Sequence, residues 1–178
     1  MPKKKADNPF IGDYAPAMDD TLALEHELAS LYKSMIGILR WMAEIGIVDI
    51  ITEVAMMAPN MAMPREAHLE TVLHVFAFLR QKCNSRMAFE PTYPVIDMNK
   101  FKECKCKDFY GNLKQAIPPN APEDRENEVD LRGYVDSNHA GEKTTRRSRF
   151  GFIIFLITFL IQWLSKKQAT IETSVFGA

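Results

Sequence analysis

Apolar residues in the first half of the chain recur at three- and four-residue steps, which is the spacing of one helix face. From Asp20 the pattern is helical, and Gly46 is a suitable end for this first helix. A second helix is predicted over 50–58, where Asp49 is suited to cap it, and a third has Pro64 in its first turn. The stripes expected to face the core are Leu28, Leu31, Met35, Leu39 and Met42 in the first helix, and Leu69, Val72, Leu73, Phe76 and Leu79 in the third.

The pattern changes after Asn84. The next stretch is rich in proline and ends in an acidic run, which is typical of a connector. From Val129 apolar and polar residues approximately alternate, which predicts a strand. The sequence therefore predicts an α+β protein with the divisions 1–18 (irregular lead-in), 19–84 (about three helices), 85–128 (connector) and 129–178 (a three-strand antiparallel sheet).

An uncharged run at 150–164 has two interpretations. Its residues are mostly β-branched or aromatic, which favours two buried strands, 150–156 and 160–167, joined near Thr158. The rival is a membrane-associated protein that uses this run. A helix needs about 20 apolar residues to cross a bilayer, so the run is short for a span and the hairpin is favoured.

Composition excludes few classes of protein but narrows the cellular setting. The apolar share of 47% suits a globular protein, and a net charge of −1 gives no overall support for a free-standing nucleic-acid binder. Three cysteines make no disulfide framework, so a reducing, intracellular location (cytoplasmic or nuclear) is expected. Basic residues nevertheless cluster locally in the last third of the chain.

Several motifs in that last third form an ordered series. They are Tyr134-Val135-Asp136-Ser137-Asn138-His139-Ala140-Gly141, then Arg146-Arg147-Ser148-Arg149, then Gln162-Trp163-Leu164-Ser165-Lys166-Lys167-Gln168. The series resembles the start of the ribonuclease H domain in copia-type retrotransposon Pol polyproteins. Upstream, the segment from Leu31 to Trp41 resembles the tail of the reverse transcriptase of the same family. The resemblance implies a truncated polyprotein fragment whose ribonuclease H-like sheet is incomplete.

For activity, the resemblance implies one catalytic position in this chain. Asp136 matches the first of four acidic residues that hold two Mg²⁺ ions in the family, and the other three are expected beyond Ala178. Hydrolysis by two metals needs several carboxylates to hold both ions. We therefore expect a fragment that does not bind Mg²⁺ stably and does not cleave RNA–DNA hybrid by itself.

Five basic residues are candidates for binding nucleic acid: Arg146, Arg147, Arg149, Lys166 and Lys167. They are expected either to contact the phosphates of an RNA–DNA hybrid or to form a solvated loop. A non-catalytic nucleic-acid-binding protein is thus the alternative to the polyprotein fragment, and no small-molecule substrate is indicated. The incomplete sheet is expected to expose apolar surface that favours aggregation or a partner.

Overall fold

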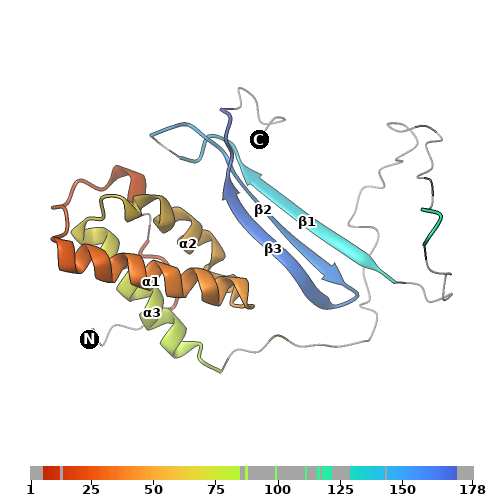
Figure 1. Ribbon diagram of the computed structural model, residues 1–178, viewed down its shortest axis with the longest axis horizontal. Helices are drawn as coiled ribbons and strands as arrows, with labels where there is room; N and C mark the ends of the chain where they lie inside the picture. Colours follow the sequence, from red (N-terminus) through yellow and green to blue (C-terminus); the bar gives the residue numbers. More distant parts are fainter. Residues whose placement is uncertain are drawn as a thin grey trace.

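The computed structural model describes residues 6–12, 14–84, 87, 99, 111, 116, 118–121, 129–142 and 144–171. A group of helices is followed by a sheet, with the elements arranged as Figure 1 shows. This order confirms the predicted α+β class. Most of the predicted connector, the cysteines Cys104 and Cys106, Glu172 and Ala178 lie outside the described residues.

The helical part contains three α-helices and three short 3-10 turns. The helices are α1 (His26–Glu44), α2 (Ile51–Met57) and α3 (Glu66–Gln81). The 3-10 turns are η1 (Pro16–Met18), η2 (Val48–Ile50) and η3 (Ala58–Met61). After α1 the chain turns at Gly46, whose φ of +131° favours glycine, so the predicted end of the first helix is confirmed.

The buried helix faces match the predicted stripes in part, since Leu39 and Val72 are buried and five further stripe residues pack partly buried against the core: Met35, Met42, Leu69, Phe76 and Leu79. In α1 the buried residues are Tyr32, Ile36, Leu39 and Ala43, and in α3 they are His68, Thr71, Val72, Val75 and Phe78. Leu28 and Leu31 are 45% and 48% exposed, and Leu73 is 47% exposed. Both helices carry apolar residues around more than one face, so periodicity alone did not identify every residue that is buried.

Two predicted helix starts are also wrong in detail. Asp49 lies within η2, and the N-cap of α2 is Ile50, which makes no side-chain cap hydrogen bond. Pro64 precedes α3, which begins at Glu66. Instead, His68 caps α3, because its Nδ1 accepts from the backbone N–H of Arg65 at 3.0 Å.

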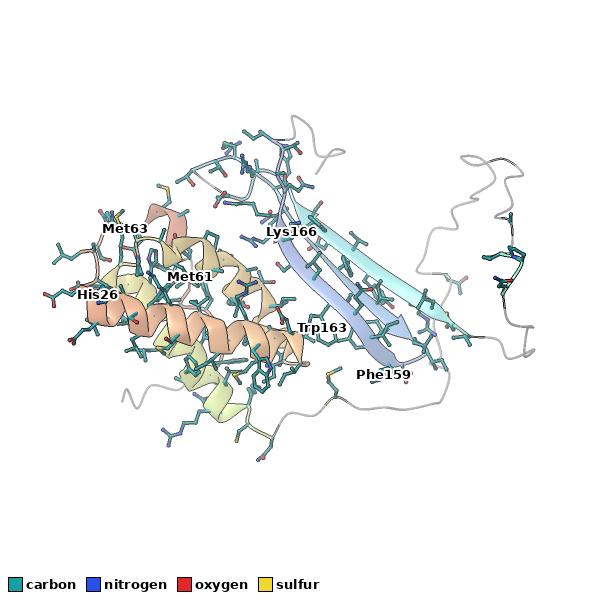
Figure 2. All side chains as sticks on the ribbon, in the orientation of Figure 1. His26, Met61, Met63, Phe159, Trp163 and Lys166 are labelled. Carbon is teal, nitrogen blue, oxygen red and sulfur yellow. The ribbon has the colours of Figure 1, made fainter. Side chains whose placement is uncertain are left out.

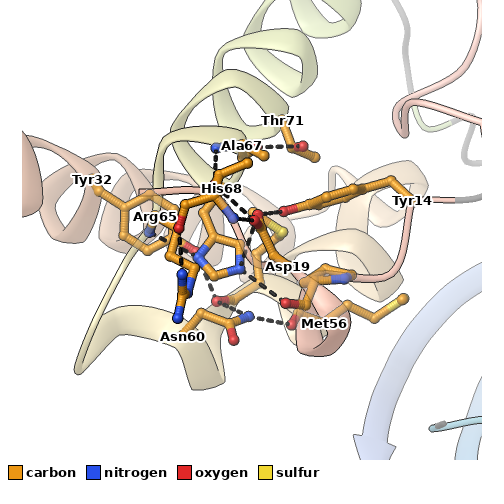
Figure 3. A network of polar contacts seen from close by, with 12 residues as sticks. Tyr14, Asp19, Tyr32, Met56, Asn60, Arg65, Ala67, His68 and Thr71 are labelled. Carbon is orange, nitrogen blue, oxygen red and sulfur yellow. Dashed lines mark hydrogen bonds and ion pairs between the residues drawn. The ribbon is translucent and has the colours of Figure 1, made fainter. Parts of the chain in front are cut away.

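A buried polar network joins the N-terminal segment to α3 (Figure 3). His68 is 3% exposed, and since its Nδ1 is an acceptor, its Nε2 carries the ring proton and donates to the carbonyl of Pro16 at 3.0 Å. Asp19 Oδ2 lies 3.6 Å from the same Nε2 and accepts from the hydroxyl of Tyr14. Thr21 donates to Asp19 through its backbone N–H and its hydroxyl. His68 is therefore a buried structural histidine whose two ring nitrogens both make hydrogen bonds.

The network shifts the pKa values of two of its members. Burial, followed by the nearby Asp19 carboxylate, raises the pKa of Tyr14 far above its usual value. Burial alone would raise the pKa of Asp19, but hydrogen bonds from Tyr14 and Thr21 outweigh it and hold the pKa below its usual value. The ionised form of Asp19 therefore stabilises the fold.

The sheet is an antiparallel meander in the order β1-β2-β3. Its strands are β1 (Leu131–Asn138), β2 (Arg149–Leu156) and β3 (Phe159–Lys167). The uncharged run at 150–164 forms β2, the turn and most of β3, which confirms the predicted hairpin. The two-residue turn holds Ile157 at a φ of +59°, a strained conformation for a β-branched residue. In the described part of the chain, no helix has the length and apolarity needed to cross a membrane.

The sheet meets the helices through β3, which lies beside α2, while β1 lies farthest away (Figure 1). Trp163 projects from β3 toward the helices (Figure 2). Its indole N–H donates to the carbonyl of Ala43 at 2.8 Å, near the end of α1, where helix carbonyls have no partner within the helix. Trp163 is therefore a packing residue that ties the sheet to the helices.

The first prediction concerns the buried Asp19 carboxylate, whose side chain is 1% exposed. Asp19→Asn should lower the free energy of unfolding at pH 7 by about 1–3 kcal/mol, because Tyr14 and Thr21 lose a charged acceptor. The pKa of Asp19 is lower in the folded protein than in the unfolded chain, where it is about 4. Ionised Asp19 therefore adds its full contribution to the free energy of unfolding above that pH, and this contribution is lost as the pH falls through the folded pKa. The difference between the two proteins should therefore shrink in acid.

Urea unfolding at several pH values measures this difference. Asp20→Asn is the matched control, since Asp20 is the exposed neighbouring residue and should change stability little. If the free energies of unfolding of Asp19→Asn and the unsubstituted protein differ by the same amount down to about pH 2, the ionised Asp19 carboxylate does not stabilise the fold.

Candidate nucleic-acid interface

Asp136 lies in β1, where it pairs with Gly151 of β2, and it is exposed. It lines a groove of about 370 Å³ between the sheet and the start of α2. It is the one carboxylate among the described residues that line this groove, and Arg149 lines it as well. The sequence therefore placed Asp136 correctly on a strand, but the strand continues to Asn138 rather than ending at Asp136.

The donor set around Asp136 does not fit a pair of Mg²⁺ ions. Hard divalent ions held close together need several carboxylate oxygens, whereas this groove supplies one carboxylate and a guanidinium that opposes a cation. Within the residues that the structure describes, no group of three or more His, Cys, Asp or Glu side chains could hold a metal ion. We therefore assign no catalytic step to Asp136.

Three of the five predicted basic residues line a second, larger groove. This groove of about 680 Å³ runs between β3 and the adjoining parts of α1 and α2. Arg149, Lys166 and Lys167 come from the sheet, and Arg40 joins them from α1. Glu44 is the one acidic residue among the described residues of its lining. We call this feature the basic groove. Its walls also include the apolar side chains Val54, Ala55, Trp163 and Leu164.

Arg40 was not among the residues that the sequence indicated. It lies on a predicted helix more than a hundred positions before Lys166, and nothing in its local spacing connects the two. Its place in the basic groove depends on the packing of β3 against the helices. The Arg40 side chain could therefore be assigned only from the tertiary structure.

Glu142 sets the local charge at one end of the basic groove. Its carboxylate lies 3.0 Å from Lys167 Nζ and accepts from the hydroxyl of Thr145. Burial alone would raise the pKa of Glu142, but hydrogen bonds from Thr145 and Lys167, together with the charge of Arg149, lower it. Glu142 is thus an anion that partly neutralises two of the groove's cations.

Arg149 is a half-buried cation. Burial lowers the pKa of its guanidinium, and the nearby Glu142 carboxylate opposes that change. An arginine stays protonated at neutral pH in proteins, so the charge persists. Arg149 lines both the groove beside Asp136 and the basic groove, and it is the one charged residue among the described residues that line both.

The other two predicted basic residues do not line the basic groove. Arg146 is exposed in the loop between β1 and β2 with a φ of +56°. Arg147 is half-buried and lines a third cavity of about 140 Å³ beside Pro16, which Arg149 and Lys167 also line. Its Nε is buried with no hydrogen-bond partner among the described residues. Arg146 therefore lies apart from the basic groove, whereas Arg147 adjoins it through the shared lining residues Arg149 and Lys167.

Comparisons with known proteins add no relative to this description. No protein-family model matches the chain, no curated protein matches it, and no solved structure matches it.

Proposed function

We propose that the chain binds the phosphate backbone of nucleic acid at the basic groove and does not cleave it. The observation that supports this proposal is the convergence of Arg40, Arg149, Lys166 and Lys167 on one groove that contains a single acidic lining residue among those described. Clustered cations attract phosphates and release their counterions, which gives binding without sequence preference. The net charge of −1 does not oppose this, because the attraction depends on the local field.

The ligand that we propose is an RNA–DNA hybrid, and the proposed origin is a copia-type Pol polyprotein. The motif series from Tyr134 to Gln168 supports this origin, and the antiparallel meander is the arrangement that the resemblance implied for the start of a ribonuclease H-like sheet. The proposed location is intracellular. Under this proposal the basic groove is a binding surface, while the described lining of the groove beside Asp136 offers one carboxylate, fewer than two-metal hydrolysis needs.

The strength of binding is expected to be modest. Two of the four cations, Arg149 and Lys167, share the field of Glu142, so the groove should neutralise about two to three phosphates. The slope of log affinity against log salt concentration should then lie between about −2 and −3. Binding that does not respond to salt would contradict the proposal.

Lys166 offers the most direct test, since it is exposed and lines the basic groove. Lys166→Ala should weaken binding of a fluorescently labelled RNA–DNA hybrid about three- to tenfold and reduce the salt slope by about one. Lys33→Ala is the matched control, because Lys33 is an exposed α1 lysine outside the lining of the groove. Equal losses in the two variants would place the binding surface elsewhere.

Glu142→Gln should have the opposite effect. The substitution keeps the shape of the side chain but removes the anion beside Lys167 and Arg149. Affinity for the hybrid should therefore rise several-fold at low salt, measured by the same anisotropy titration. Glu70→Gln, at an exposed site on α3, is the control with the same change in net charge. A loss of affinity in Glu142→Gln alone would reject the proposed electrostatics.

Catalysis is tested separately. The purified chain should release no more fragments from an RNA–DNA hybrid in Mg²⁺ than the Asp136→Asn variant does, because one carboxylate does not hold two ions. Cleavage is followed on a denaturing gel with an end-labelled RNA strand. Mg²⁺-dependent cleavage that disappears in Asp136→Asn would overturn the non-catalytic assignment while leaving the binding result intact.

A further inference from the structure

β1 forms one edge of the described sheet, opposite the β3 edge that lies beside the helices. β1 spans Leu131–Asn138 and pairs with β2 without a bulge. It contains no proline and no lysine, which are residues that commonly protect an edge strand. Its apolar side chains are exposed, with Leu131 at 63% and Val135 at 77%. An unprotected edge of this kind is a template for another strand.

The hydrogen bonds of β1 identify which residues face that edge. The carbonyl of Asp130 accepts from the N–H of Ile157 at 2.7 Å, so Asp130 directs its backbone toward β2. Backbone direction alternates along an antiparallel strand. Arg132, Tyr134 and Asp136 therefore point their N–H and C=O groups toward β2. The groups of the intervening residues, Leu131, Gly133, Val135 and Ser137, point outward.

The charges of β1 are arranged to complement a copy of the same strand. Arg132 and Asp136 lie symmetrically about Tyr134 and on the same face of the sheet, because residues two apart share a face. In an antiparallel pair of two β1 strands centred on Tyr134, Arg132 of each copy lies opposite Asp136 of the other. A twofold axis makes this contact occur twice.

The outward backbone groups fit the same register. Leu131 then lies opposite Ser137 and Gly133 opposite Val135, and all of these residues offer N–H and C=O groups to the partner. Arg132 and Asp136 fall at the non-hydrogen-bonded positions, where opposite Cα atoms are about 4.5 Å apart and side chains are closest. The exposed Val135 side chain meets Gly133, which has nothing within 4 Å of the position of a Cβ atom.

Neighbouring registers are less favourable. Sliding one strand by two residues in one direction places Asp136 opposite Asp130, which sets two carboxylates against each other. Sliding it in the other direction places Asp136 opposite Tyr134 and Arg132 opposite Asn138, so both charges lose a charged cross-strand partner. Arg132 already donates to Asp130 of its own strand through Nε at 2.9 Å, and its guanidinium has further N–H groups available.

From this geometry we propose that two copies of the chain associate through antiparallel pairing of their β1 edges, in the register centred on Tyr134. The association joins two three-strand sheets into one continuous sheet. This association is independent of nucleic-acid binding, because the basic groove lies along β3, the strand at the opposite edge of the sheet from β1. The occupant of the edge is a second copy of this chain.

Charge reversal tests the register. Sedimentation equilibrium of the full chain should show a monomer–dimer equilibrium, and Arg132→Asp or Asp136→Arg should each weaken it about tenfold or more, because each sets like charges opposite one another twice. The double variant restores opposite charges and should recover the association. Trp41→Ser is the control: Trp41 is 61% exposed on α1, away from the strand, and its loss should leave the dimer unchanged.

A crosslink tests the centre of the pair independently of charge. In a background with Cys83→Ser, Cys104→Ser and Cys106→Ser, Tyr134→Cys should form an intermolecular disulfide on mild oxidation, because its own copy lies opposite within disulfide reach. Val135→Cys faces Gly133 of the other copy and should crosslink far less. Circular dichroism checks that each variant keeps its fold.

Three results would overturn the proposal. They are a chain that stays monomeric at all concentrations reached, a dimer that neither single charge reversal weakens, and a Val135→Cys variant that crosslinks as readily as Tyr134→Cys. A monomer would mean that another segment or another protein covers the edge. A dimer weakened by Trp41→Ser and not by the charge reversals would place the interface on α1.

Discussion

The contact between β3 and the ends of α1 and α2 is the interaction on which the rest of the structure depends. Trp163 supplies both parts of it, since its ring packs toward the helices and its N–H satisfies the carbonyl of Ala43. A helix end that is buried without such a partner is costly, and an indole N–H that is buried needs an acceptor. One side chain therefore meets two requirements at the point where the sheet joins the helices.

The basic groove follows from that contact, because its two walls belong to different halves of the chain. Arg40 comes from α1, and Arg149, Lys166 and Lys167 come from the sheet. Bringing these cations together raises their mutual repulsion, and Glu142 offsets part of it through Lys167 and Arg149. The same carboxylate that makes the cluster stable thus limits how strongly the groove attracts an anion. The balance of charge, more than the count of basic residues, determines what the groove binds.

The surroundings of Asp136 show how context decides the role of a carboxylate. In a cluster of acids an aspartate on a strand holds metal ions, whereas here the groove beside it contains a cationic Arg149 and no second carboxylate among its described lining residues. Along β1 itself, Asp136 and Arg132 stand on one face, two residues either side of Tyr134. The described lining of this groove therefore does not favour binding of a pair of divalent ions at Asp136.

The sequence by itself determined the class of fold, the order of helices before strands, the hairpin within 150–164 and the strand position of Asp136. These features depend on local periodicity and on runs of β-branched and aromatic residues, which act over a few positions. Which apolar residues of α1 and α3 are fully buried, the His68 cap and the joining of Arg40 to the β3 lysines were decided only in the tertiary structure. A helix with apolar residues on more than one face has no local reason to bury Tyr32 and Ile36 rather than Leu28 and Leu31. That choice depends on which surface the other elements cover, and it sets contacts between residues far apart in the chain.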